Sequence, residues 1–585
     1  MYSTKTYNES IELLNSLQSN ASTLDQIRKH RKEADLRSIP EMIQCFKRIG
    51  YNPVDFNRLN AIHISGTKGK GSTSAFVERI LREFGKTITN QSIPVIDKNN
   101  NVHNHTSENE LFEKQEKFKT GLFTSPHMIE VRERIRLDGV PISKDLFTKY
   151  FFQVWEKFHN DSDLRSPLNT SEKVLGKNEN ILNHNVEHDE KLISRTEKPI
   201  IPSYFRFLTL LAFHVFVQEG VSVAVIETGI GGEYDSTNIL VSPTVCGITS
   251  IGLDHVDILG NSIPEIALQK AGIMKKGSVA ISAPDQDSEA IKVFEKVAEE
   301  RHCEFKIAKT LDQYIQHTNS LKLHAPEIGI AGEHQVINAA LAVELCFQWM
   351  KRSKWSAKHP EAIQDTDIEN TGKYLPEWVL EGLKKTKWPG RSHSFIPPKH
   401  PNIKWFLDGA HTKDSMNACV QWFLKETNNS KTPCILIFSP AHGRNKPELI
   451  KELIQVVNKR PFLKIIFCNK ITFNPETTNK NIAHNPKELN ELLDSWKNVS
   501  LENTCKNTTQ NHVNLTSDLE KISLLNSIND AVEYVYTNYG KQTPLNHKEN
   551  NNQMIPEKEI QFNVLVTGSL HLVGGVLDVT NTPIW

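Results

Sequence analysis

The amino-acid sequence predicts an α/β protein with two domains, and three observations support this fold class. The chain has 585 residues, which gives room for about two to four domains. Short runs rich in β-branched residues alternate with segments of helical periodicity, as they do where helices connect parallel strands. Gly and Pro residues gather near residues 375–390, between two such blocks. We therefore expect one domain over residues 1–385 and a smaller one over residues 386–585.

These patterns also place the individual strands and helices. In the first block we expect strands at residues 61–64, 221–226 and 245–250. In the second block we expect strands at residues 405–407, 434–438, 464–468 and 564–566, with helices at 415–424 and 446–457. The longest apolar run, Phe205–Val217, contains Arg206 and His214 and is too short to cross a bilayer. We interpret it as a buried helix and expect no transmembrane segment.

Charge and cysteine usage exclude several classes of protein. The 69 Lys and Arg residues balance 69 Asp and Glu residues, so no overall positive field favours nucleic acid. An anionic ligand therefore needs a local binding site. The eight cysteines include no C-x-x-C pair, which argues against a zinc ribbon or a disulfide framework and favours core positions in a reducing compartment. We expect no targeting segment at the N-terminus, which has acidic residues early and no long apolar stretch.

Three stretches break the globular pattern because they are rich in Asn, Lys, His and Glu: residues 91–118, 158–199 and 470–520. Such compositions bury too little apolar surface to offset the entropy of ordering, so we interpret the stretches as surface insertions. The histidine pairs His103 with His105 and His184 with His188 are metal-site candidates by residue type. We interpret them as solvated loop histidines, since no rigid ligand set surrounds them.

A glycine-rich loop follows the first predicted strand. Residues 65–73 read Ser-Gly-Thr-Lys-Gly-Lys-Gly-Ser-Thr and precede a helix with apolar residues at Phe76, Ile80 and Phe84. A strand, a glycine turn and a helix N-terminus form a phosphate cradle, to which Lys70 adds a positive charge. The spacing departs from the common P-loop, because Gly71 lies between Lys70 and Ser72. A flexible turn is the alternative, but both flanks favour a site for ATP or GTP.

Candidate magnesium ligands follow two other predicted strands. Glu227 comes directly after the strand at 221–226, and Asp254 and His255 follow the strand at 245–250. Carboxyl ends of parallel strands face the crevice in which such sheets bind ligands. Either position alone is more often structural than functional. Together, near a phosphate loop, they predict hard ligands for a nucleotide-bound Mg²⁺.

Taken in order, the motifs resemble the folylpolyglutamate synthases of the ATP-dependent Mur ligase superfamily. The resemblance rests on residues 66–73, Thr124–Arg136, Glu227–Asn238, Gly252–Gly260, Gln269–Ile273, Gly332–Ala340, Trp388–Arg391, Asp408–Ser415 and Thr567–Gly575. Tyr7–Asn20 looks like the eukaryotic branch, and the Asn-rich insertions look fungal. The fold implied is an N-terminal P-loop-type ATPase domain with a parallel sheet, plus a smaller C-terminal Rossmann-like α/β domain.

The resemblance implies roles in the first domain. Phosphates of ATP would be held by Gly69, Lys70, Gly71 and Ser72, and the adenine would face Asn338. Mg²⁺ would be bound by Ser125, Glu227 and His255. Lys270 matches a lysine that the family converts to a carbamate serving a second Mg²⁺, which requires a neutral amine. The sequence itself shows only the lysine, and a helix ion pair is the alternative.

In the second domain, the resemblance implies that Arg391 and Asp408 reach the nucleotide and that His411 lies near the γ-phosphate or the incoming amino acid. Lys70, Lys270 and His411 are the residues we expect to act in catalysis. The segment Ser439–Asn445 departs from the family pattern, which leaves the role of Arg444 open. We expect ATP to lie between the two domains.

The implied activity is a ligase that adds L-glutamate to the γ-carboxylate of tetrahydrofolate through an acyl phosphate, using ATP and Mg²⁺. A monovalent cation is compatible with this chemistry. We expect a monomer in the cytoplasm with a mitochondrial pool, acting on a reduced folate. Dihydrofolate synthase has the same fold and chemistry and stays an alternative, as does a nucleotide-binding switch protein. The sequence does not determine the preferred folate, the tail length or the role of the insertions.

Overall fold

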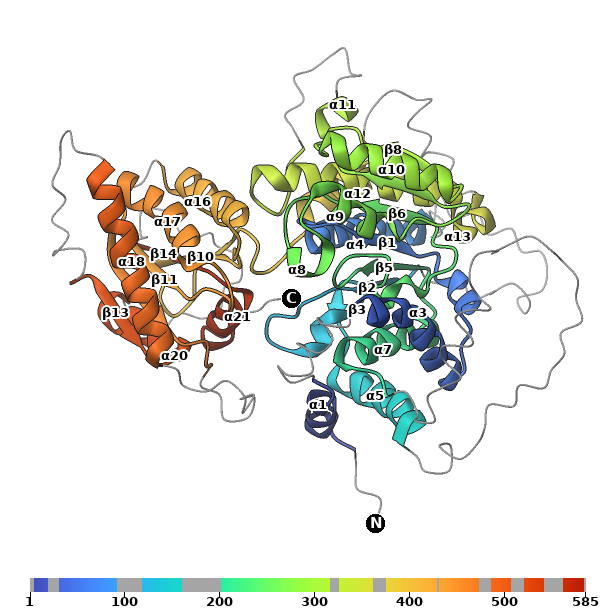
Figure 1. Cartoon of the computed structure of the whole chain (residues 1–585), viewed down its shortest axis with the longest axis horizontal. Coiled ribbons are helices and arrows are strands. Elements are labelled where there is room, and N and C mark those ends of the chain that lie inside the picture. Colours follow the sequence, from blue (N-terminus) through green and yellow to red (C-terminus); the bar gives the residue numbers. More distant parts are fainter. Residues whose placement is uncertain are drawn as a thin grey trace, which may run out of the picture. The chain divides into compact units, whose positions relative to one another are not determined.

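The chain folds into two compact units. The computed structural model describes residues 5–18, 31–91, 118–159, 201–315, 326–360, 375–428, 431–472, 486–506, 520–540 and 561–582 (Figure 1). Unit 1 comprises Met1–Pro126, Arg132–Glu327 and Ile337–Lys385, and unit 2 comprises His127–Val131, Ile328–Val336 and Thr386–Trp585. Two short segments that precede the expected boundary at residue 385 therefore belong to unit 2. The division into two ligase domains stays a prediction.

Unit 1 is built on an eight-stranded sheet with the order β4-β3-β2-β5-β1-β6-β7-β8. The strands are β1 (Ile62–Ser65), β2 (Thr120–Phe123), β3 (Ile135–Leu137), β4 (Val140–Pro141), β5 (Val223–Glu227), β6 (Val245–Ile248), β7 (Val279–Ser282) and β8 (Glu304–Ile307). All are parallel except β3 and β4, which form an antiparallel edge. The three strands expected from the sequence are β5, β1 and β6, the neighbours at the centre of the sheet. All three strands are buried along their whole length, and their largely apolar sequences make them easy to recognise.

Helices surround this sheet (Figure 1). They are α1 (Tyr7–Ser16), α3 (Arg31–Arg48), α4 (Lys70–Gln91), α5 (Lys144–His159), α7 (Tyr204–Gln218), α8 (Val256–Leu259), α9 (Ile263–Ala271), α10 (Ser288–Glu300), α11 (Leu311–Ile315), α12 (Glu333–Arg352), α13 (Lys354–Lys358) and α15 (Glu377–Lys385). In α4, Phe76, Ile80 and Phe84 are buried, as the periodicity predicts. The apolar run from Phe205 forms the buried helix α7, also as predicted.

Unit 2 contains a six-stranded sheet with the order β13-β12-β11-β14-β10-β9. Its strands are β9 (His393–Phe395), β10 (Ile403–Asp408), β11 (Cys434–Phe438), β12 (Phe462–Cys468), β13 (Ile522–Leu525) and β14 (Phe562–Thr567), and only β9 is antiparallel. Its helices are α16 (Lys413–Thr427), α17 (Lys446–Lys459), α18 (Pro486–Lys506), α20 (Ile528–Tyr539) and α21 (Leu570–Val579). All four predicted strands and both predicted helices are present.

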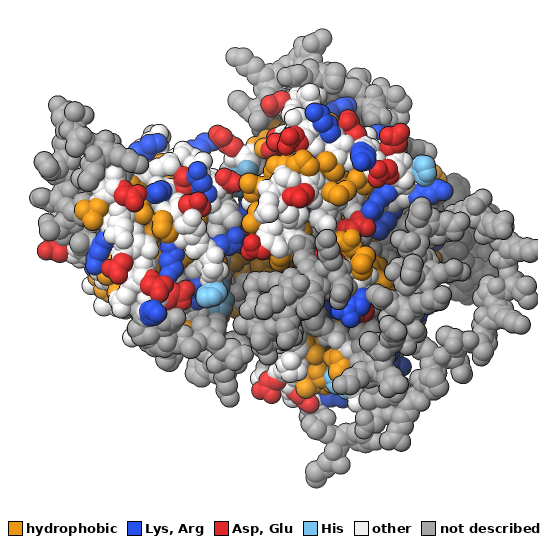
Figure 2. Space-filling view, in the orientation of Figure 1, with side chains coloured by type: hydrophobic (Ala, Val, Ile, Leu, Met, Phe, Trp, Pro, Cys, Tyr) orange, Lys and Arg blue, Asp and Glu red, His pale blue; other side chains and the backbone are white. Residues whose placement is uncertain are grey.

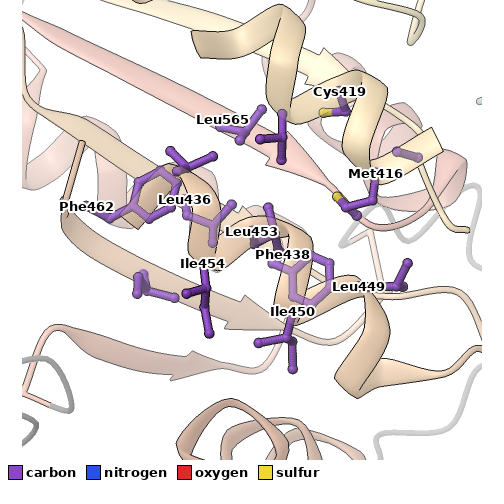
Figure 3. Packing of buried hydrophobic residues seen from close by; sticks show 14 of the residues in the cluster. Met416, Cys419, Leu436, Phe438, Leu449, Ile450, Leu453, Ile454, Phe462 and Leu565 are labelled. Carbon is purple, nitrogen blue, oxygen red and sulfur yellow. The ribbon is translucent and has the colours of Figure 1, made fainter. Parts of the chain in front are cut away.

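Alternation along the strands gives this second sheet two cores. In β11, Leu436 and Phe438 point into a cluster with α16, α17 and α18, which Figure 3 shows from close by. Ile435 and Ile437 of the same strand point into the other cluster, with α20 and α21. A sheet covered on both faces is the doubly wound arrangement that a Rossmann-like fold requires.

The third expected insertion is partly wrong. Residues 486–506 form α18, whose side chains Leu489, Leu492, Trp496 and Val499 are buried in the core of unit 2. Their spacing of three or four residues is helical, but the polar average composition of the stretch hides it. The rest of that stretch, residues 473–485 and 507–519, lies outside the described residues. So do residues 92–117 and 160–200, which include the two histidine pairs.

Surface and cysteine positions fit the composition. Acidic and basic side chains are interspersed over the described part of the face in Figure 2, as expected from a net charge of zero. Among the described helices, none is both long and apolar enough to cross a membrane. Seven of the eight cysteines have side chains that the structure describes, and all seven are buried and unpaired, as predicted for core positions.

Candidate active site

The glycine loop of unit 1 joins β1 to α4 in a conformation that only glycine accepts. Gly66 has φ +141° and Gly69 has φ +87°. A Cβ atom would lie 1.8 Å from Thr249 Oγ1 at Gly66 and 2.1 Å from Asn338 Oδ1 at Gly69. The loop thus packs directly against the segment after β6 and against α12. The structure brings Asn338, predicted to face adenine, next to the predicted phosphate loop.

The first turn of α4 supplies backbone donors. Lys70, Gly71 and Ser72 are its first three residues, and the N–H groups at a helix start have no acceptor within their own helix. Thr73 is the first whose N–H group donates within the loop and helix, to Gly69 O at 2.8 Å. These donors and the positive end of the helix dipole are suited to phosphate oxygens.

Two lysines meet at one carbonyl oxygen of this loop. Lys70 Nζ donates to Gly66 O at 3.1 Å, and Lys270 Nζ, from the last turn of α9, donates to the same oxygen at 2.7 Å. Burial lowers the pKa of both amines. The charge of Lys70 lowers the pKa of Lys270 further. Two positive charges at this position would repel each other, and an anionic ligand would offset that repulsion.

Ser125 and Glu227 also meet. Glu227 ends β5 with its side chain buried, and its Oε2 accepts the Ser125 N–H at 2.9 Å. The Glu227 carboxylate opposes the lowering of the pKa of Lys70, so it lies within the electrostatic range of the phosphate loop. Two of the three predicted Mg²⁺ ligands are therefore adjacent in space, and Glu227 lies near the loop.

The third predicted ligand, His255, lies farther from the end of its strand than expected, because β6 ends two residues earlier than predicted. β6 ends at Ile248, and His255 follows an irregular segment at the start of α8, with φ +50°. The preceding residue, Asp254, pairs with Lys68 of the phosphate loop at 3.0 Å, and this contact fixes the segment against the loop. Asp254 is thus engaged with a loop lysine, while the metal role of His255 stays a prediction.

The donor chemistry around the loop fits Mg²⁺. A buried carboxylate and a serine next to it are hard oxygen ligands of the kind that Mg²⁺ uses together with nucleotide phosphates. Within the described part of the chain, no three His, Cys, Asp or Glu side chains gather into a metal site of their own. The predicted set contains only two such side chains, so it depends on Ser125, on Lys270 and on the nucleotide for its other ligands.

Unit 2 carries a second cluster at the carboxyl end of β10. Asp408 is buried, and its two oxygens accept the N–H groups of Ser392 at 2.8 Å and Ala410 at 2.9 Å. Burial raises the pKa of Asp408, and the Arg391 guanidinium opposes this rise. His411 Nδ1 donates to Gly409 O at 2.9 Å. The structure thus brings together the three residues predicted for this domain.

His334 joins this second cluster, although its individual role was missed from the sequence. It belongs to the segment Ile328–Val336 of unit 2, and burial lowers its pKa while the nearby Asp408 carboxylate opposes the shift. It lies in the Gly332–Ala340 motif, so the motif was recognised but only Asn338 was selected from it. Nothing in local periodicity shows that a residue in the first turn of α12 meets the end of β10.

Comparisons with known proteins identify the family. The Mur ligase middle domain family matches residues 205–346. A probable folylpolyglutamate synthase of Schizosaccharomyces pombe is 34% identical and covers 100% of this chain and 95% of the relative. The chain belongs to the folylpolyglutamate synthase family. A folylpolyglutamate synthase of Saccharomyces cerevisiae is 33% identical and covers 98% of this chain and 87% of the relative. Both relatives are yeast proteins, which confirms the predicted ligase family and its fungal character.

Solved folylpolyglutamate synthases share the fold. The Mycobacterium tuberculosis enzyme complexed with ADP has a TM-score of 0.59 at 17% identity and covers 99% of both chains. The apo form of the L. casei enzyme has a TM-score of 0.57 at 18% identity, over 99% of this chain and 100% of that one. The predicted fold class is confirmed. The roles of individual site residues stay predictions.

Proposed function

We propose that this protein is an ATP-dependent ligase that adds L-glutamate to the γ-carboxylate of a tetrahydrofolate. The observation that carries the proposal is the convergence of Lys70, Lys270, Glu227 and Asn338 on one glycine loop in a member of this family. We also propose that the enzyme is a monomer and that it acts in the cytoplasm, with a further pool in mitochondria.

ATP binding follows from the loop. The N–H groups at the start of α4 and the Lys70 amine would hold the phosphates, and Asn338 would face the adenine. Lys70 now bonds to Gly66 O, a neutral acceptor that a phosphate oxygen would replace with a charge-assisted bond. Nucleotide binding would also relieve the repulsion between Lys70 and Lys270.

Ser125, Glu227 and His255 would hold Mg²⁺, and a monovalent cation is compatible with the same chemistry. When bound, Mg²⁺ supplies positive charge that offsets the repulsion between two anionic reactants. The neutral amine of Lys270 would attack CO₂ and release a proton, which gives a carbamate. That conversion needs an uncharged amine, and burial together with the neighbouring Lys70 favours this form.

The chemical problem is that a carboxylate resists attack by an amine. The substrate carboxylate attacks the γ-phosphorus of ATP, ADP leaves, and the resulting acyl phosphate has a good leaving group. The glutamate amine then attacks the acyl carbon, loses a proton and displaces phosphate. Lys70 and the N–H groups of α4 would stabilise the transferred phosphoryl group. His411, Asp408 and Arg391 would position the nucleotide and the incoming glutamate from unit 2.

The test is incubation of the purified protein with ATP, Mg²⁺ and glutamate plus either tetrahydrofolate or dihydropteroate. Successive glutamyl mass increments on tetrahydrofolate support the proposal. Glutamylation of dihydropteroate alone would make the protein a dihydrofolate synthase instead. ATP hydrolysis without a glutamylated product would favour the nucleotide-binding switch.

A further inference from the structure

Asp235 is a buried carboxylate that the reaction scheme does not use. It lies just beyond the loop that follows Glu227, and its side chain is 7% exposed. Oδ2 accepts the N–H groups of Gly229 at 2.9 Å and Ile230 at 3.1 Å. Oδ1 accepts the N–H of Thr237 at 3.0 Å and its hydroxyl at 2.6 Å. Four donors on one side chain satisfy an ionised carboxylate, because each of its oxygens only accepts.

These bonds close the loop on itself. The residues from Thr228 to Gly232 connect the carboxyl end of β5 to the segment that carries Asp235. Without the Asp235 carboxylate, the N–H groups of Gly229 and Ile230 would lose their charged acceptor. The bonds to Gly229 and Ile230 therefore decide the path of the backbone directly after Glu227.

The segment around Asp235 is itself anchored in the core. Thr237 Oγ1 contacts His63 Nε2 at 2.8 Å, and His63 lies fully buried in β1, the strand that leads to the phosphate loop. Ser236 Oγ contacts Thr209 Oγ1 of α7 at 3.0 Å. Asp235 thus connects the loop to residues that are anchored in the buried centre of the sheet.

The far end of the same loop rests on α9. Glu233 N donates to Gln269 O at 2.8 Å, and a Cβ atom on Gly232 would lie 2.8 Å from Lys270 O. The loop held by Asp235 therefore runs from the residue before it, Glu227, to the backbone of Lys270. Both ends carry residues of the proposed site.

We propose that Asp235 is a positioning residue, which fixes the loop between Glu227 and Lys270 and so sets the geometry in which magnesium and nucleotide bind together. This inference rests on the proposed function. It differs from a purely structural role in one respect: loss of the carboxylate should weaken the magnesium-dependent part of nucleotide binding more than the magnesium-free part.

The experiment measures ADP binding by isothermal titration calorimetry, with MgCl₂ and with EDTA, on the full chain. Asp235→Asn keeps the shape but turns an amide N–H₂ toward one pair of donors. We expect ADP affinity in MgCl₂ to fall about ten-fold, the lower end of the effect of losing an outer support of a metal ligand. Affinity in EDTA should stay within about two-fold of the unmodified protein.

A second variant covers the case in which Asp235→Asn does not fold. Thr237→Val removes the hydroxyl donor and its contact with His63 but leaves both bonds to the loop. Its affinity in MgCl₂ should fall about three-fold, because only one of four hydrogen bonds is lost. The matched control is Asp287→Asn, since Asp287 is an exposed cap of α10 that accepts from Glu289 N. It should bind ADP like the unmodified protein in both buffers.

The inference would be overturned if Asp235→Asn bound ADP in MgCl₂ as tightly as the unmodified protein does. Where Asp235→Asn is unfolded, the same comparison is made with Thr237→Val. Equal losses in MgCl₂ and EDTA would also overturn it and leave a structural role. Glu227→Gln separates the two levels of the proposal. If magnesium does not tighten ADP binding, or if Glu227→Gln leaves the tightening intact, the proposed magnesium site itself is wrong.

Discussion

The two units place their candidate site residues at equivalent positions in their sheets, but the two sets of residues differ in charge. In unit 1 the carboxyl ends of β1 and β5 and the turn of α9 bring two lysines and backbone N–H groups around a glycine loop. In unit 2 the carboxyl end of β10 brings a buried carboxylate together with an arginine and histidines. Parallel sheets expose ligand sites at the same edge in both cases.

The difference in charge indicates that the two units interact with different parts of the substrates. The two lysines of unit 1 and the N–H groups at the start of α4 suit a polyanion. They would attract the phosphates of ATP whatever the other substrate is. A cluster of mixed charge suits a zwitterion such as glutamate and can respond to the γ-phosphate. We therefore expect variants of the glycine loop in unit 1 to weaken nucleotide binding. In unit 2, we expect variants of His411 to slow turnover with ADP binding retained.

Lys70→Ala should show the largest effect, a fall of about 10³-fold in kcat/KM, because the amine offsets charge that develops on the transferred phosphate. The side chain donates to a carbonyl oxygen of the loop, Gly66 O, so the fold should be retained. Steady-state glutamylation assays measure the fall in kcat/KM, and thermal unfolding checks that the fold is retained. Lys276→Ala, at an exposed position, is the control and should keep full activity. Unchanged glutamylation in Lys70→Ala would refute the assignment.

His411→Ala tests unit 2. We expect kcat/KM for glutamate to fall about 10²-fold, as for other positioned groups at a reacting centre. ADP lacks the γ-phosphate, so its affinity should stay within about three-fold. His442→Ala, exposed in the same unit, should leave both values unchanged. A large loss of ADP affinity in His411→Ala would contradict the proposed division between the units.

Gly69→Ala tests how closely the loop is fitted. The added Cβ would meet Asn338 Oδ1, and φ +87° is strained for alanine. We expect ADP affinity to fall about ten-fold with the protein still folded. The control is Gly252→Ala, where a Cβ meets nothing within 4 Å. If both variants bind ADP equally well, the loop does not hold the nucleotide.

Lys270→Met gives the smallest effect and concerns stability. Because burial lowers the folded-state pKa of Lys270, the unfolded chain binds this proton more readily, and stability rises as the pH rises toward the ordinary lysine pKa. Methionine removes this dependence. In buffer freed of CO₂ at pH 7, we expect Lys270→Met to be more stable by about 1 kcal/mol in chemical unfolding. A less stable variant, or an unchanged pH slope, would argue against the repulsion between the two lysines.

The sequence by itself determined the parts of this site that are contiguous in the chain. The strand, glycine loop and helix around Lys70 form one local pattern, and Glu227 and Asp408 each end an apolar strand whose burial makes it recognisable. Residue type and position at a strand end were enough to select Glu227, whereas Asp408 was selected through the family resemblance of its motif. The mistaken insertion at 486–506 shows the limit of composition, which averages out a helical spacing of apolar residues.

Only the tertiary structure decided which of these residues meet. Lys270 shares Gly66 O with Lys70, Asn338 packs on Gly69, and His334 joins Asp408, each across a long sequence separation. Asp235 gained a role only when its four donors became visible. Such contacts follow from the order of strands in the sheet and from the packing of helices on it. Neither is encoded in the periodicity of any one segment, because periodicity reports which face is buried and not what lies against it.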